Sequence, residues 1–206
     1  MTGIVSSMAD NLVLGAHELV WGALGALLSF LAGAACCAVM VNYARLRQMH
    51  SLYALPLLLE AALLLCFGVL GARLAAVQGL FVPVTVMLLC FIMGLQNAVI
   101  SKLSRAEIRT THITGIVTDI GIELGKTFYW NAAHTTAVAR VSADRAKLRV
   151  LATLATSFFV GGVVGALGFK QLGYVATVPL AVLLIALALI PAVDDAMRSV
   201  RSRRDR

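Results

Sequence analysis

Charged residues are scarce in this sequence. Asp, Glu, Lys and Arg make up 13% of its 206 residues, whereas hydrophobic residues make up 60% and the mean hydropathy is +0.91. A soluble globular domain typically carries about 25% charged residues. The composition therefore excludes a soluble domain and indicates an integral membrane protein.

The scarcity of charge is greatest in five long apolar runs. Each run reaches the roughly 20 residues with which a helix crosses about 30 Å of hydrocarbon. Glu60 is the only Asp, Glu, Lys or Arg inside them. We expect five membrane-spanning helices, at residues 19–44, 48–72, 74–101, 150–169 and 171–193.

Cysteine is also rare, and its positions do not suggest metal chemistry. All four cysteines lie inside apolar runs, without histidines or acids at the spacing of metal ligands. Such cysteines are usually small packing residues. We predict no metal site and no cofactor.

Basic residues outnumber acidic ones, and many of them lie at the C-terminus. The net charge is +7. Basic residues directly after a membrane helix usually mark the cytoplasmic side and contact anionic lipid. We therefore expect a cytoplasmic tail at residues 194–206, membrane lipid as a partner and no binding of nucleic acid. The tail arginines are Arg198, Arg201, Arg203, Arg204 and Arg206.

The sequence repeats itself. Residues 1–6 (Met-Thr-Gly-Ile-Val-Ser) recur at 113–118 (Ile-Thr-Gly-Ile-Val-Thr), and residues 29–33 (Ser-Phe-Leu-Ala-Gly) resemble 157–161 (Ser-Phe-Phe-Val-Gly). An apolar run precedes the second copy of the motif but not the first. We expect one membrane domain, 1–206, with repeats at 1–72 and 74–193 and with a sixth helix upstream of Met1.

Charge placement predicts how the repeats are oriented. Basic residues follow the first and third apolar runs and precede the fourth, which places these ends on one cytoplasmic face. Three crossings in each half then make the repeats inverted, as in many solute transporters. If residues 102–149 crossed the membrane, the repeats would be parallel instead. The predicted fold is an all-α transmembrane bundle of two three-helix inverted repeats, each with an amphipathic motif helix.

The second motif begins a segment with helical periodicity. One face is apolar, and the others carry hydroxyls, a histidine and two acids. Hydroxyls, a small glycine and free N–H groups at a helix start suit an anionic or polar solute. The alternative is a helix that lies flat on the membrane. The candidate solute-binding residues here are Thr110, Thr111, His112, Thr114, Gly115, Thr118 and Asp119.

Three further polar side chains lie inside apolar runs. Gln96 and Asn97 are costly in hydrocarbon unless hydrogen-bonded, so we expect them either to join helices or to contact the solute. Glu60 lies midway through its run, where an ionised carboxylate is expensive. Glu60 is therefore either a proton site or one member of a structural pair.

Two segments carry a family resemblance. Residues 94–98 (Gly-Leu-Gln-Asn-Ala), followed by 109–115 (Arg-Thr-Thr-His-Ile-Thr-Gly) and then Thr118 and Asp119, resemble the signature of the YoaK-like family of small bacterial membrane proteins. The resemblance spans nearly the whole chain. It implies about six membrane helices, an earlier His-Met-Thr-Gly motif whose histidine is absent here, and an unknown function.

Three functional hypotheses follow. The first is a bacterial inner-membrane transporter or permease for a small polar or anionic solute. The second is a membrane scaffold that binds lipid or a partner protein through its basic face. The third is an enzyme that uses His112 and Asp119, but seven positions separate them by about 10 Å along a helix. We therefore expect no enzymatic activity, and the sequence leaves the oligomeric state open.

Overall fold

The computed structural model describes residues 1–49, 51–74, 78–103, 113–128 and 143–189, and every regular element within them is helical. The prediction of an all-α fold is confirmed for these residues. The elements are α1 (Thr2–Val13), α2 (His17–Leu46), α3 (Ala54–Leu74), α4 (Gln78–Leu103), α5 (Ile113–Phe128), α6 (Arg145–Leu172) and the 3₁₀ turn η1 (Gly173–Ala176), followed by helical residues 177–189.

Four helical segments in the described part of the chain are long and apolar enough to cross a membrane. They are His17–Leu46, Ala54–Gly71, Pro83–Leu103 and Arg145–Leu189. The fourth segment covers the predicted run 150–169 and most of the run 171–193, because η1 and helical residues 177–189 follow α6 directly, although the chain turns at Gly173. The chain is therefore a membrane-type helical protein, and five crossings stay a prediction.

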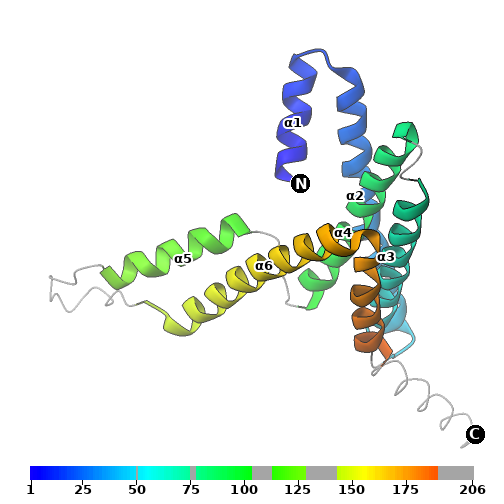
Figure 1. Ribbon diagram of the computed structural model, residues 1–206. Helices are drawn as coiled ribbons and strands as arrows, with labels where there is room; N and C mark the ends of the chain where they lie inside the picture. The colour runs from blue at the N-terminus through cyan, green and yellow to red at the C-terminus, as the bar shows by residue number, and fades with distance from the viewer. Residues whose placement is uncertain (50, 75–77, 104–112, 129–142, 190–206) are drawn as a thin grey trace, which may run out of the picture.

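Each copy of the repeated motif begins a helical hairpin, in which a short helix pairs with a longer one (Figure 1). A tight turn, in which Gly15 has a φ of +72°, joins the short helix α1 to α2, and α1 packs on α2. The short helix α5 packs on α6. The repeat seen in the sequence thus has a counterpart in the local structure.

The central contact of the molecule joins α2 to α4. A Cβ atom added at Gly33 would clash with the carbonyl oxygen of Phe91, and one added at Gly94 would clash with that of Phe30. Ser29 Oγ also donates a hydrogen bond of 2.6 Å to the Met87 carbonyl. Small residues at such positions let two membrane helices approach backbone to backbone.

The two helices run parallel, since residues further along α2 meet residues further along α4. Beyond the glycines, both helices contribute to one buried apolar cluster, which consists of Cys37, Val41, Leu95 and Val99. The parallel arrangement brings the basic end of α2, with Arg45, to the same end of the bundle as Lys102 of α4. These two basic positions therefore share one end, as the charge pattern predicts.

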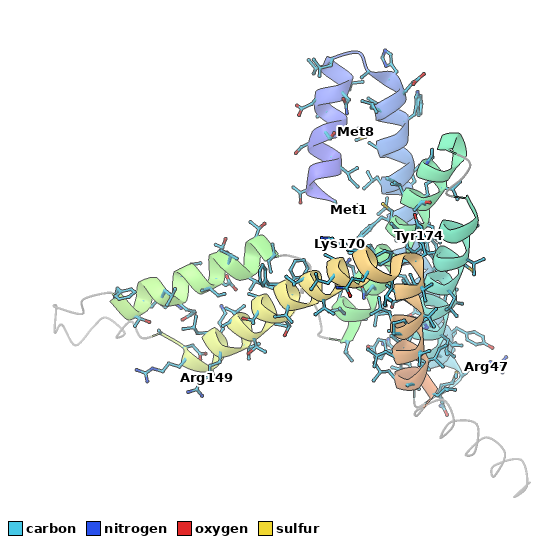
Figure 2. The ribbon with its side chains drawn as sticks, viewed as in Figure 1. Met1, Met8, Arg47, Arg149, Lys170 and Tyr174 are labelled. Atoms are coloured by element: carbon cyan, nitrogen blue, oxygen red, sulfur yellow. The ribbon has the colours of Figure 1, made fainter. Side chains whose placement is uncertain are left out.

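An aromatic cluster attaches the end of α6 to α3. The ring of Phe67 lies 5.7 Å from that of Tyr174 and 6.3 Å from that of Phe169, between centroids. The Tyr174 ring also covers Gly71, and Figure 2 shows Tyr174 at the junction between α6 and the bundle. From this junction the α5–α6 hairpin extends away from α2, α3 and α4 (Figure 1).

Candidate functional site

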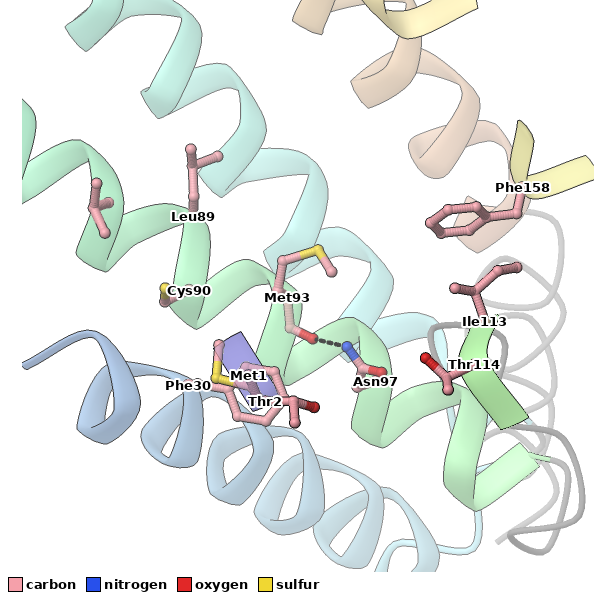
Figure 3. Close-up of a pocket in the computed structure, with 11 residues that line it drawn as sticks. Met1, Thr2, Phe30, Leu89, Cys90, Met93, Asn97, Ile113, Thr114 and Phe158 are labelled. Atoms are coloured by element: carbon pink, nitrogen blue, oxygen red, sulfur yellow. Dashed lines mark hydrogen bonds between the residues drawn. The ribbon is translucent and has the colours of Figure 1, made fainter. Parts of the chain in front are cut away.

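A cavity of about 520 Å³ lies between the α1–α2 hairpin, α4 and the α5–α6 hairpin (Figure 3). The start of α1, the middle of α2, one side of α4, the start of α5 and the middle of α6 all contribute to it. Its lining consists of Met1, Thr2, Phe30, Val86, Leu89, Cys90, Met93, Asn97, Ile113, Thr114 and Phe158. A volume of this size is in the range of sites for small molecules.

The lining contains three pairs of residues that correspond in the two repeats. Met1 and Thr2 of the first motif match Ile113 and Thr114 of the second, and Phe30 matches Phe158 in the two Ser-Phe segments. Both motif copies thus meet at one cavity, with α4 supplying the remaining wall. Transporters built from repeats bind their solutes at the interface between the repeats.

The first described residues of both short helices lie at this cavity. Thr2 is the first residue of α1 and Ile113 is the first residue of α5. The first N–H groups of a helix lack partners within it, and the helix dipole adds partial positive charge at this end. Met1 gives α1 no side-chain cap. No Asp, Glu, Lys, Arg or His side chain lines the cavity among the described residues, so its polar side chains are neutral hydroxyls and an amide.

The polar side chains of the cavity are Thr2, Asn97 and Thr114. In Figure 3, Asn97 lies between the other two. Its Nδ2 atom donates a hydrogen bond of 2.7 Å to the Met93 carbonyl on the same helix. This hydrogen bond fixes the orientation of the Asn97 amide in the wall of the cavity.

Several predicted binding residues lie outside this lining. Gln96 is half-buried on α4, Gly115 is exposed on α5, and the Thr118 hydroxyl donates to the Thr114 carbonyl at 2.8 Å. Asp119 forms an ion pair with Lys147 of α6, with 3.4 Å between Oδ2 and Nζ. Of the predicted motif residues that the structure describes, only Thr114 lines the cavity.

Other predicted positions are not part of this site. Glu60 is 3% exposed on α3 and does not line the cavity. Thr110, Thr111 and His112 lie outside the described residues. The five tail arginines also lie outside them: Arg198, Arg201, Arg203, Arg204 and Arg206.

A second polar cluster fastens α5 to α6. Glu123 has a side chain only 2% exposed, and its Oε1 accepts a hydrogen bond of 2.8 Å from Lys126 Nζ. Its Oε2 accepts from the backbone N–H of Asp144 at 3.0 Å. Asp144 in turn caps α6 by accepting from the N–H groups of Ala146 and Lys147. We refer to Glu123, Lys126, Asp144 and Lys147 as the clasp.

The clasp alters the pKa of both acids. The hydrogen bond from Lys126, and then that from the Asp144 backbone, lower the pKa of Glu123 below its ordinary 4.5. The two backbone N–H groups of α6 lower the pKa of Asp144 below its ordinary 3.8. Hydrogen bonds that favour the charged form have this effect. Both carboxylates are therefore ionised at neutral pH and hold the hairpin together.

The predicted apolar face of α5 is only partly the face that packs on α6. Ile116 and Glu123 are buried, whereas Val117 is 58% exposed and Phe128 is 84% exposed. The packed face is thus centred on Ile116 and Glu123. The buried Glu123 carboxylate is tolerated on this face because the clasp provides its hydrogen bonds.

Several residues that line the cavity could not be predicted from their own type and position in the sequence. Phe30, Phe158 and Met93 carry no chemical signal on their own, but the two Ser-Phe segments were visible as a repeat. Within the described part of the chain, no group of three His, Cys, Asp or Glu side chains could hold a metal ion, and the four cysteines are free.

The helices and the cavity define a membrane-type helical protein built from two similar hairpins. The chain belongs to the family described as "Protein of unknown function (DUF1275)", whose model matches residues 1–190. No curated protein and no solved structure matches the chain. The match agrees with the predicted family resemblance in its extent and in its unknown function, and the YoaK-like name stays a prediction.

Proposed function

We propose that this protein is a transporter or permease of the bacterial inner membrane that binds a small polar or anionic solute in the cavity between its two hairpins. The observation that carries the proposal is the meeting of both motif helices, at their first residues, on one cavity. Thr2 and Thr114, at matching positions of the two motifs, border this common space, and repeat transporters bind their solutes at such an interface between repeats.

The inverted arrangement of the repeats belongs to the same proposal. Parallel α2 and α4 place the basic residues Arg45 and Lys102 at one end, which supports a common cytoplasmic face for these two ends. The similar hairpins α1–α2 and α5–α6 support the duplication. The YoaK-like name and the absence of enzymatic activity remain part of this proposal.

Glu60 is the proposed proton site. It is a buried carboxylate on a helix long and apolar enough to span the membrane, and acids in such positions are usually functional. It lies outside the cavity lining, so it would act on transport rather than on the binding of the solute. Glu60→Gln should then leave solute binding unchanged while abolishing flux driven by a proton gradient in vesicles.

Thermal shifts of the purified protein test the solute site. The ligands are phosphate, nitrate and acetate as anions, with neutral amino acids and sugars as polar solutes. A ligand at about 100 times its Kd stabilises the native state by about 2.7 kcal/mol. We expect a hit among these ligands, and Thr114→Val should remove it. Thr153→Val, a matched change at an exposed α6 residue outside the cavity, should not.

A substitution at Asn97 tests whether the cavity prefers anions. Asn97→Asp places a carboxylate in the cavity with almost no change of volume, and it loses the hydrogen bond that Asn97 Nδ2 donates to the Met93 carbonyl. It should abolish stabilisation by anions, because like charges repel at short range in a site of low dielectric constant. Stabilisation that persists in both Thr114→Val and Asn97→Asp would show that the ligand binds elsewhere.

A membrane scaffold is the second candidate, and the basic end of the bundle favours it. Arg45, Arg47 and Lys102 lie at the end where α2 and α4 finish, next to apolar segments long enough to span the membrane. Such an end attracts anionic lipid. This candidate predicts that binding to anionic lipid is weakened when the arginine tail is removed and is unaffected by Thr114→Val.

A further inference from the structure

The junction between α6 and η1 has a backbone conformation that favours glycine. Gly173 has a φ of +59° and a ψ of −140°, and residues with a Cβ atom rarely adopt this region. A Cβ atom added at Gly173 would meet nothing within 4 Å. The bend of the chain therefore requires the glycine, and crowding by neighbouring atoms does not.

The chain on the C-terminal side of this bend is fixed to α3. The Tyr174 ring covers Gly71, and the Thr177 side chain packs against Gly68 on the same helix. Thr177 is 1% exposed, and its hydroxyl donates a hydrogen bond of 2.9 Å to the Tyr174 carbonyl. Two neighbouring contacts on α3 thus hold η1 in place.

The chain on the N-terminal side of the bend has fewer attachments. Among the described elements α1 to η1, α6 packs on α5 and η1, and its last turn contacts α3 through the rings of Phe169 and Phe67. From this junction α6 runs across the direction of α2, α3 and α4 (Figure 1). The clasp holds α5 to the start of α6. The α5–α6 hairpin is therefore a lever that is attached to the bundle near Gly173.

This lever forms one wall of the cavity. Three lining residues belong to the hairpin, and Figure 3 shows them together at one side of the cavity: Ile113, Thr114 and Phe158. Phe158 lies roughly 21 Å along the helix axis from the end of α6, so a rotation of about 10° at Gly173 would move it by about 4 Å. Such a displacement exceeds the diameter of a water molecule, which is about 2.8 Å.

We propose that Gly173 is the hinge of a gate, at which the α5–α6 hairpin rotates as one body and opens or closes the cavity. A hinge absorbs changes of φ and ψ beside a segment that keeps its place. Gly173 supplies the first property, and the docked Tyr174 supplies the second. The motion is inferred from the junction, whereas its role as a gate rests on the proposed solute site.

Distances between spin labels in lipid nanodiscs test the motion. Labels on unnatural amino acids leave the four native cysteines in place. One pair joins α3 to the hairpin, at the exposed positions Val69 and Phe159, and a reference pair lies within the hairpin, at the exposed positions Ile122 and Val150. We expect a broader distance distribution for Val69–Phe159 than for the reference pair, because the clasp keeps the hairpin rigid.

An alanine at the hinge should change the first distribution only. Gly173→Ala disfavours the φ of +59° and should shift the Val69–Phe159 distances without moving the reference pair. Gly15→Ala is the matched control, because Gly15 also has a positive φ and open surroundings but lies in the α1–α2 turn. A narrow Val69–Phe159 distribution in the unmodified chain would overturn the proposal even if Gly173→Ala does not fold, and so would distances that Gly173→Ala leaves unchanged.

The reaction of Cys90 with N-ethylmaleimide tests the gate without a solute. Cys90 is a buried residue of the cavity lining, whereas Cys66 is exposed on α3 and outside the lining. Gly173→Ala disfavours the observed open conformation, so it should slow the modification of Cys90 by roughly fivefold or more. Cys66 should react at an unchanged rate, with both sites followed by peptide mass spectrometry.

The outcomes separate the hinge, the gate and the solute site. An unchanged rate at Cys90 together with shifted spin-label distances would overturn the gate and leave a hinge. The absence of any ligand-induced thermal shift would count against the solute site, whereas the distances and the reaction rate of Cys90 do not depend on a solute.

Discussion

The Ser-Phe segment of α2 and that of α6 are similar in sequence but differ in their surroundings. In α2 the glycine touches the backbone of α4, whereas in α6 the corresponding glycine faces open space. The difference shows that small residues permit a close helix contact but do not create one. A second helix with a matching surface is also required.

The addition of one methyl group should destabilise the α2 segment and have little effect on the α6 segment. Gly33→Ala in α2 places a Cβ against the Phe91 carbonyl, and such overpacking should lower the free energy of unfolding by about 1–3 kcal/mol. Gly161→Ala in α6 should change it by less than about 0.5 kcal/mol. Reversible unfolding in mixed micelles measures both, and equal effects would contradict the difference in packing.

Low pH should weaken the α5–α6 hairpin but not the α2–α4 contact. A carboxylate with a lowered pKa stabilises the fold above its unfolded pKa, and this contribution is lost as the pH falls through the folded value. Glu123 and Asp144 should therefore release α5 from α6 as the pH falls below 4.5. The glycines and phenylalanines of the α2–α4 contact do not titrate, so that contact should persist.

Hydrogen exchange measured from pH 7 to pH 3, corrected for intrinsic rates, follows this separation. Protection of α5 and of the first turn of α6 should fall in acid before that of α2. Glu123→Gln keeps an acceptor for the Asp144 N–H but loses the charge that attracts Lys126. The variant should show weaker protection at pH 7 and a smaller change on acidification. An unchanged profile would show that the clasp does not hold the hairpin.

The smallest effect is expected at Asp119. Its ion pair with Lys147 joins side chains that are 45% and 49% exposed. Exposed pairs of this kind contribute about 0.2–1 kcal/mol. Asp119→Asn should therefore lower the free energy of unfolding by no more than this and leave ligand-induced thermal shifts intact. Loss of a ligand shift would instead place Asp119 in the solute site.

The sequence predicted the helices well because they depend on composition and periodicity. The long uncharged run of α2 and the repeated motifs of α1 and α5 are local patterns. Asn97 was expected either to join helices or to contact the solute, because amides are costly in hydrocarbon, and it lies in the wall of the cavity. The pairing of Asp119 with Lys147 depends on the angle between α5 and α6, which is a tertiary property. For the same reason, the burial of Glu123 was not predicted.

The junction at η1 shows a similar limit of local patterns. The predicted runs 150–169 and 171–193 indicate a break near Lys170, and the chain does turn directly after it, where Gly173 has a φ of +59°. The aromatic cluster that fixes this turn against α3 joins residues about 100 positions apart in the sequence. Such contacts depend on packing, which periodicity does not encode.

The backbone contact between α2 and α4 also limits how the molecule can move. Side chains between helices can adopt new rotamers when the helices slide, but carbonyl oxygens packed directly on glycines have no such freedom. The two helices must therefore move as one rigid body. Any opening of the cavity then requires displacement of the short helices or of the α5–α6 hairpin, and Gly173 lies where that hairpin joins the rest of the chain.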